Sequence, residues 1–194
     1  MDSCNIVLAG VGGLGILLAA EIIGTAAVKE GYNVRVSELH GMAQRGGAVV
    51  SHVRIDEKAL APTVLEGTAD AIVSLEPMEA LRNIKFATPK TIVLVNTKPF
   101  KISGTKYPEV NVLLEQLRNF TKNTILIDAA ALAEKAGTGI TQNVVMMGAL
   151  AAVKRLPMKV ETLKEALREL VPTKYLNINM KAFELGYDYV KASK

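Results

Sequence analysis

The sequence of 194 residues is poor in the side chains from which redox, metal and nucleic-acid sites are most often built. It contains no tryptophan, one cysteine (Cys4) and two histidines (His40 and His52), and only 5% of its residues are aromatic. A single thiol forms no disulfide within the chain and holds no iron–sulfur cluster, which is ligated by several cysteines. Because histidine is scarce and no HExxH-like spacing occurs, we predict no metal site on this chain.

The charge pattern and the short apolar runs exclude two further classes of protein. The net charge is +4, and the lysines and arginines are scattered along the chain. We therefore expect no nucleic-acid partner. Apolar runs such as Ile16–Ala20 are far shorter than a membrane-spanning helix, so we expect no membrane contact. The first residues lack the basic segment and cleavage site of a signal peptide, and we expect a cytoplasmic location.

Short apolar runs alternate with helix-like segments, without an internal repeat or a low-complexity linker. The runs typical of buried strands are residues 5–9, 33–38, 48–55, 70–76, 91–96 and 124–128. The segments typical of helices are residues 16–28, a stretch starting at 77, a stretch following 128, 143–156, a stretch near 163–171, and the C-terminal tail. This alternation predicts a three-layer α/β/α sandwich with a mixed, mostly parallel sheet, a Rossmann-like variant, in one domain covering residues 1–194.

The connection between the second and third expected strands is short. Only about His40–Gly47 separates them, whereas a parallel crossover needs roughly a dozen residues or more. These strands are therefore expected to run antiparallel, or not to follow one another directly in the sheet.

The helices expected at Ile16–Val28 and Asn143–Leu156 are apolar nearly all round, so each must be covered on more than one side, by the sheet and another helix or by a partner subunit. Asn143 is the expected N-cap of the later helix. Thr162 and Glu165 have the spacing of a capping box.

A glycine-rich turn follows the first expected strand. Gly10, Gly12 and Gly15 have GxGxxG spacing, and Glu38 ends the second strand at about the distance of the ribose-binding acid in dinucleotide-binding proteins. This pattern favours a NAD(P)- or FAD-binding Rossmann oxidoreductase, although such glycines also serve close packing of a strand on a helix. The short connection after Glu38, the lack of room for a substrate domain and the lack of a proton-handling pair weigh against that enzyme.

A second polar loop, HGMAQRGG, covers residues 40–47. Arg45 stands among glycines, and a guanidinium binds a carboxylate or phosphate in a bidentate manner. If the first two strands are neighbours, both loops lie at one edge of the sheet and form one anion site. Alternatively, Arg45 pairs with Glu38 or Glu76 and only holds the loop in place. We expect His40 to be a structural residue.

Five segments resemble, in order, the gamma-type domain of 2-oxoacid:ferredoxin oxidoreductases. They are GVGGLGILLAAEIIG, VSELHGMAQRGGAVVSHVRI, ADAIVSLEPMEALRN, VNTKP and NVVMMGALAA. The likeness extends from Asn5 to about Tyr187 and is greatest to the small beta-subunit chains of the indolepyruvate type. HGMAQRGG is its most specific part, because dinucleotide-binding Rossmann domains do not share it.

The resemblance implies an accessory subunit of an enzyme complex. Members of the family oxidatively decarboxylate a 2-oxoacid with coenzyme A and pass the electrons to ferredoxin. Thiamine diphosphate, Mg²⁺ and the iron–sulfur clusters are then expected on a large partner subunit, because this chain has too few cysteines and no GDG…N pattern. No catalytic residue is expected on this chain.

The resemblance also implies a shared coenzyme A site. The positions that match the family motif are Gly10, Gly12, Gly13, Gly15, Gln44, Arg45, Gly46 and Gly47. Leu14 stands where many relatives have a polar residue, which leaves a side-chain contact at that point open. A stand-alone module that binds coenzyme A or a nucleotide, without a large subunit, is the remaining alternative.

Overall fold

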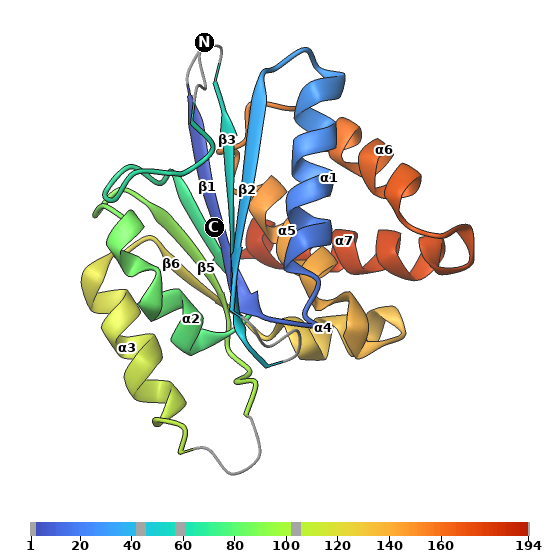
Figure 1. Ribbon diagram of the computed structural model, residues 1–194. Coiled ribbons are helices and arrows are strands. Elements are labelled where there is room, and N and C mark those ends of the chain that lie inside the picture. The colour runs from blue at the N-terminus through green and yellow to red at the C-terminus, as the bar shows by residue number, and fades with distance from the viewer. Residues whose placement is uncertain (1–2, 42–45, 57–60, 102–105, 194) are drawn as a thin grey trace.

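A six-stranded mixed sheet forms the centre of the protein in a computed structural model that describes residues 3–41, 46–56, 61–101 and 106–193 (Figure 1). The spatial order of the strands is β2-β3-β1-β4-β5-β6. Their bounds are β1 Cys4–Val11, β2 Val34–His40, β3 Ala48–Ile55, β4 Ala71–Ser74, β5 Ile92–Asn96 and β6 Thr124–Ile127. Strands β1, β4, β5 and β6 are parallel, whereas β3 runs antiparallel to both β1 and β2. The predicted antiparallel pairing after the short connection is confirmed.

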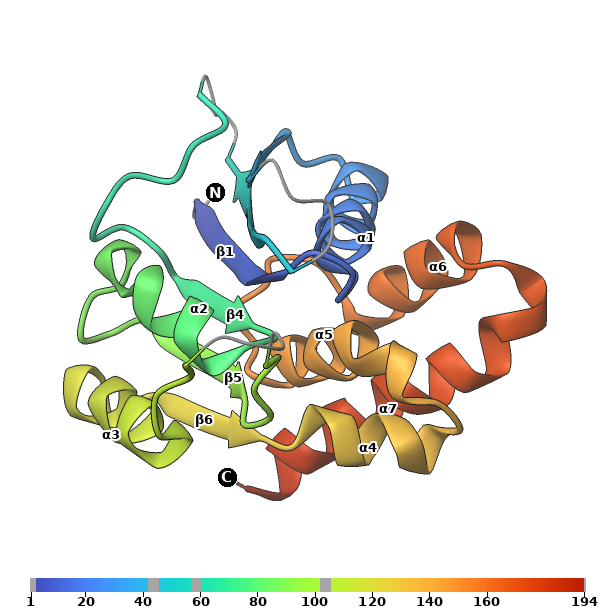
Figure 2. The same cartoon turned by 60° about the horizontal axis from the view of Figure 1, so that its bottom comes forward.

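Helices cover both faces of the sheet, which confirms the predicted three-layer α/β/α architecture (Figures 1 and 2). The helices are α1 Ile16–Lys29, α2 Pro77–Arg82, α3 Val110–Phe120, α4 Ala129–Ala136, α5 Gln142–Ala152, α6 Val160–Leu170 and α7 Leu176–Ala192. Three short 3₁₀ segments are η1 Ile84–Phe86, η2 Gly139–Thr141 and η3 Thr173–Tyr175. Helices α2 and α3 lie on one face, and α1, α4, α5, α6 and α7 lie on the other.

The inner strands β1, β4 and β5 are mostly apolar because both of their faces are buried. In β1, Ile6 and Leu8 pack in the large core under α1 and α5, whereas Val7 packs in the smaller core on the opposite face. Side chains alternate between the faces of a strand, so a two-sided core removes the usual polar alternation. This explains why an uninterrupted apolar run marks each central strand.

The second nearly all-apolar helix, α5, lies between the sheet and α7. All its residues after Gln142 are buried. Two glycines, Gly148 on α5 and Gly186 on α7, allow the backbones of these helices to come into direct contact. A Cβ at Gly148 would overlap the main chain of Phe183, and a Cβ at Gly186 would overlap the main chain of Val145. The apolar surface of α5 is therefore buried by the sheet and α7 of this chain itself.

Two predicted helix boundaries are wrong. Helix α5 begins at Gln142 after Thr141, so Asn143 lies inside its first turn and is not the N-cap, and the helix ends at Ala152 rather than Leu156. Helix α6 begins at Val160 after Lys159, so the predicted capping box does not form.

In both cases a long-range contact replaces the local cap. The Asn143 side-chain amide donates to the Gly15 carbonyl oxygen (3.1 Å). The Thr162 hydroxyl donates to a carboxylate oxygen of Glu30 (2.5 Å). Helix α3 was not predicted, although Leu113, Leu114 and Leu117 form its buried stripe.

Candidate functional site

The two loops singled out in the sequence meet at one edge of the sheet. The premise that the first two strands are neighbours is wrong, because β3 lies between β1 and β2. However, β3 begins where the other two end: Ala48 is opposite Val11, and Val49 is opposite His40. An antiparallel strand inserted between two parallel ones brings the loops that follow β1 and β2 to the same edge.

Direct backbone hydrogen bonds join the two loops. The Gly12 N–H donates to the Gly47 carbonyl oxygen (2.8 Å), and the Gly46 N–H donates back to the Gly12 carbonyl oxygen (3.4 Å). Gly46 has a positive φ of 79°. The glycines at the end of the second loop therefore hold the turn that follows β1.

Among the described residues, no side chain caps the first helical N–H groups of α1, which follow the turn after β1. Gly15 occupies the cap position in the left-handed conformation (φ 79°), and the first turn contains no acidic residue. The N–H groups that open a helix have no acceptor within the helix and carry the positive end of its dipole. This end of α1 can therefore receive an anion.

The fingerprint glycines are required for different reasons. A Cβ at Gly10 would collide with Ile16 and Leu75, so Gly10 allows the strand to pack closely on the helix. Gly13 has a positive φ of 102°, and nothing lies within 4 Å of its Cβ position, so it exposes backbone. Gly15 combines a positive φ with the close approach of Asn143. Asn143, predicted as the N-cap of α5, instead donates a hydrogen bond to this turn.

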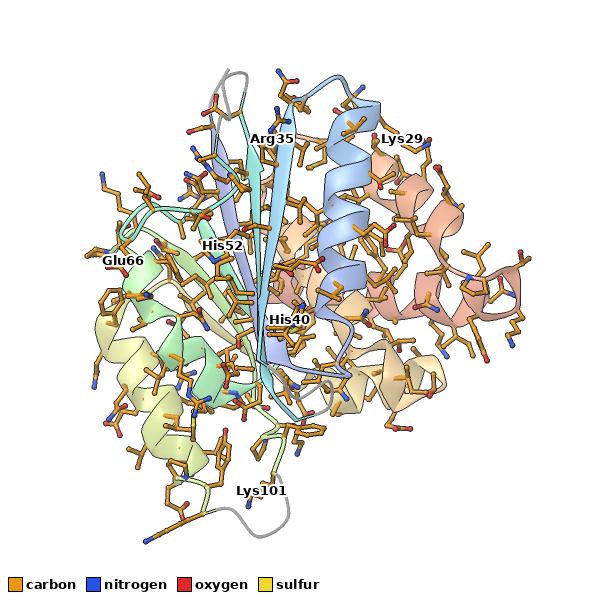
Figure 3. The ribbon with its side chains drawn as sticks, in the orientation of Figure 1. Lys29, Arg35, His40, His52, Glu66 and Lys101 are labelled. Carbon is orange, nitrogen blue, oxygen red and sulfur yellow. The ribbon has the colours of Figure 1, made fainter. Side chains whose placement is uncertain are left out.

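A cavity of about 610 Å³ opens at this edge beside the N-terminus of α1. Its lining includes Gly12, Gly13 and Gly15 of the turn, and His40 and Gly41 after β2. Figure 3 shows His40 at the end of β2 near the turn. No acidic side chain lines this cavity among the residues that the structure describes, so nothing there repels an anion. We refer to it as the turn cavity.

Elsewhere along this edge, polar side chains at strand ends are already engaged. The Glu76 carboxylate after β4 accepts the Glu79 N–H (3.0 Å) at the start of α2 and a hydrogen bond from the Tyr107 hydroxyl. Asn96 of β5 accepts the Ala129 N–H (3.1 Å) at the start of α4. Side chains cap these two helices, whereas no side chain of the described residues caps α1.

The geometry disfavours the dinucleotide interpretation. In a Rossmann fold the acidic residue ends the strand next to the first one. Here β3 separates Glu38 from β1, which places it two strand spacings away, about 10 Å. Glu38 is exposed and lines a groove against α1, together with Glu21, rather than the turn cavity.

Two predicted contact residues, Gln44 and Arg45, lie outside the described residues. The role of Arg45, whether it binds a ligand or pairs with Glu38 or Glu76, therefore stays a prediction. Gly41 and Gly46, which flank this segment in the sequence, both lie at the site.

The single cysteine is structural. Cys4 is 4% exposed and its thiol donates to the Arg155 carbonyl oxygen (3.4 Å). Burial, with a smaller contribution from the charge of Asp70, raises the pKa of the Cys4 thiol to about 12, so it is no thiolate ligand at neutral pH. Within the described ranges, no three His, Cys, Asp or Glu residues group as a metal site, and no helix is long and apolar enough to cross a membrane.

Comparison with known proteins assigns the family. The model described as pyruvate ferredoxin/flavodoxin oxidoreductase matches residues 5–189. The chain belongs to this family. As a member, it is an accessory subunit of a 2-oxoacid:ferredoxin oxidoreductase, and the resemblance seen in the sequence is confirmed.

Full-length relatives and a solved structure agree with this assignment. The chain is 44% identical to the Archaeoglobus fulgidus protein named indolepyruvate oxidoreductase subunit IorB, covering 95% of this chain and 94% of that protein. It is 30% identical to the common subunit gamma of the Pyrococcus furiosus pyruvate/ketoisovalerate oxidoreductases, covering 92% of each. The crystal structure of a keto/oxoacid ferredoxin oxidoreductase gamma subunit from Geobacter sulfurreducens superposes with a TM-score of 0.74 at 26% identity, covering 97% and 99% of the two chains.

Proposed function

We propose that this chain is the small subunit of an oxidoreductase of the indolepyruvate or arylpyruvate type and supports coenzyme A-dependent oxidative decarboxylation. The observation that carries the proposal is the 44% identity, over nearly the whole of both chains, to a protein named as an indolepyruvate oxidoreductase subunit. Residues 1–194 are proposed to form one gamma-type domain that works in the cytoplasm with a large partner subunit. That partner holds thiamine diphosphate, Mg²⁺ and the iron–sulfur clusters and reduces ferredoxin.

The turn cavity is proposed as the contact of this chain with a phosphate of coenzyme A. The start of α1, which no described side chain caps, supplies N–H donors and a positive dipole, and Gly13 leaves the backbone open to the cavity. Gly12 is engaged with Gly46 and Gly47, so its N–H holds the loop and is not a ligand donor. Arg45, four residues after Gly41, is proposed to add a charge-assisted contact.

The proposal is tested with the reconstituted complex. The large subunit is assayed for 2-oxoacid-dependent ferredoxin reduction with and without this chain, at several coenzyme A concentrations. We expect a stable complex and coenzyme A-dependent turnover only in the mixture. Turnover at full rate by the large subunit alone would contradict the assignment, and micromolar coenzyme A binding by the monomer without any complex would favour the stand-alone module.

Arg45→Ala tests the anion contact within the same assay. We expect the Michaelis constant for coenzyme A to rise by about ten- to a hundredfold, as for the loss of one charge-assisted hydrogen bond. Arg35→Ala, which removes an exposed arginine of β2, is the matched control and should leave the constant unchanged. An unchanged constant for Arg45→Ala, in a folded protein, assigns Arg45 to the structure of the loop.

A further inference from the structure

A second cavity, of about 440 Å³, opens on the other side of the glycine-rich turn. Its walls come from the start of α1, from η2 and the first turn of α5, and from η3 with the beginning of α7. Gly13, Gly15 and Leu18 line both cavities, so the turn is a wall between them. We call this second space the ring cavity. The proposed coenzyme phosphate contact does not use it.

The lining of the ring cavity selects an uncharged, apolar group. Every described residue of the lining is uncharged, and Leu18, Val171 and Ile178 supply aliphatic walls. Tyr175, 48% exposed, and Ile140, 84% exposed, add large apolar surface that no described part of the chain covers. Burying a charge here would be costly because no counter-charge lies in the wall. An uncharged, largely apolar group suits such a surface.

Two asparagines give the ring cavity a directional preference. Asn143 and Asn179 line it and are 5% and 8% exposed. Each donates through its side-chain N–H to a backbone carbonyl, Asn143 to Gly15 (3.1 Å) and Asn179 to Tyr175 (2.9 Å). These bonds orient both amides and leave each Oδ1 without a donor among the described residues. A carbonyl oxygen of this kind accepts an N–H or O–H from a ligand.

We propose that the ring cavity binds a planar nitrogen heterocycle that carries an N–H donor. The ring packs on Leu18, Ile178 and Tyr175, and its N–H donates to an asparagine Oδ1. The volume suits a small ligand group. Two molecules of the proposed reaction carry such a ring, an arylpyruvate of the indole type and the adenine base of coenzyme A. Only the choice between these sources rests on the proposed function; the binding of a ring depends on the cavity alone.

Neutral probes separate this inference from the anion site. The intact chain contains no tryptophan, so the fluorescence of added indole is read without tryptophan emission from the protein, with excitation beyond the absorption band of its tyrosines. We expect saturable binding of indole or of adenosine, with adenosine measured by calorimetry and by displacement of indole. Indole binding that adenosine does not displace identifies the aryl acid as the source, and tight adenosine binding identifies the base. 1-Methylindole lacks the N–H and should bind about tenfold more weakly than indole.

A pair of variants locates the binding. Tyr175→Ala removes an exposed ring of the lining and should weaken the bound probe at least about fivefold, in line with the loss of one aromatic contact. Phe120→Ala removes a comparably exposed ring (43%) at the end of α3, on the other face of the sheet, and should change nothing. Thermal unfolding verifies that both variants fold.

Three results would overturn the inference. They are the absence of saturable binding of both probes at millimolar concentration, equal loss in the two variants, and equal affinity for indole and 1-methylindole. If coenzyme A fails to bind while indole or adenosine binds, the anion contact is wrong and the ring cavity stands.

Discussion

Replacing Gly15 by alanine tests how the turn before α1 is held. Gly15 has φ 79°, a conformation that costs an L-residue about 1–2 kcal/mol. A Cβ at this position would also overlap the Asn143 amide and displace it from the Gly15 carbonyl oxygen. Loss of that hydrogen bond adds about 1 kcal/mol. We therefore expect Gly15→Ala to lower the free energy of unfolding by about 2–3 kcal/mol.

A double-mutant cycle with Asn143→Ala separates the two contributions. Without the amide, Gly15→Ala should cost only the backbone strain, about 1–2 kcal/mol, so the coupling between the two sites is about 1 kcal/mol. Urea unfolding of the four proteins, followed by circular dichroism, measures each difference at constant m-value.

Gly13→Ala is the matched control for the strain alone. Gly13 also has a positive φ, 102°, but nothing lies within 4 Å of its Cβ position. Its cost should therefore not depend on Asn143. An equal cost of Gly15→Ala with and without Asn143 would refute the idea that this amide constrains the turn, and so would a cost below that of Gly13→Ala.

Three further predictions concern the core. Gly148→Ala should destabilise the protein by about 2–3 kcal/mol, because its Cβ would overlap the backbone of Phe183. The control Gly24→Ala, whose Cβ makes only an ordinary contact, should stabilise the protein by about 0.5–1 kcal/mol through helix propensity. Urea unfolding midpoints measure both changes, and stabilisation by Gly148→Ala would contradict the close packing of α5 on α7. Burial lowers the pKa of His52 from 6.5, so as the pH falls the unfolded chain binds a proton at this histidine before the folded protein does. The stability contributed by the neutral ring is therefore complete above pH 6.5 and is lost as the pH falls below it. His52→Gln should flatten this part of the stability–pH curve, and an unchanged slope would exclude His52 as its source. Cys4 is buried, and its thiol pKa is raised to about 12. We expect it to react with a disulfide reagent at pH 8 only when the protein unfolds. Rapid modification of the native protein would contradict this and show that the first strand opens.

The features that the sequence predicts correctly are those set by local physics. Each central strand was located because a strand buried on both faces is apolar throughout, and α1 and α4 end beside Gly31 and Gly137, which adopt positive φ values as expected of helix stops. The antiparallel pairing of β2 with β3 followed from the length of one connection. The family assignment followed from the order of the motifs.

Local spacing predicts the wrong contact where a distant hydrogen-bond partner competes with a local one. Asn143 and Thr162 both have the chemistry of a cap, and the folded protein uses them to reach Gly15 and Glu30 instead. Both contacts join segments more than a hundred residues apart. Such partners leave no periodic pattern in a single sequence, so local spacing favoured the wrong role.

The sequence by itself determined the three-layer class, the family and the existence of two glycine-rich loops, because periodicity, connection length and motif order are all properties of neighbouring residues. Only the tertiary structure decided how the loops meet. The insertion of β3 between β1 and β2 joins Gly12 to Gly46 and Gly47 and moves Glu38 away from the turn. The tertiary structure also forms the ring cavity, whose walls come from three distant parts of the chain. Strand order and cavities depend on which distant segments pack together, and that is decided by burial of the whole core.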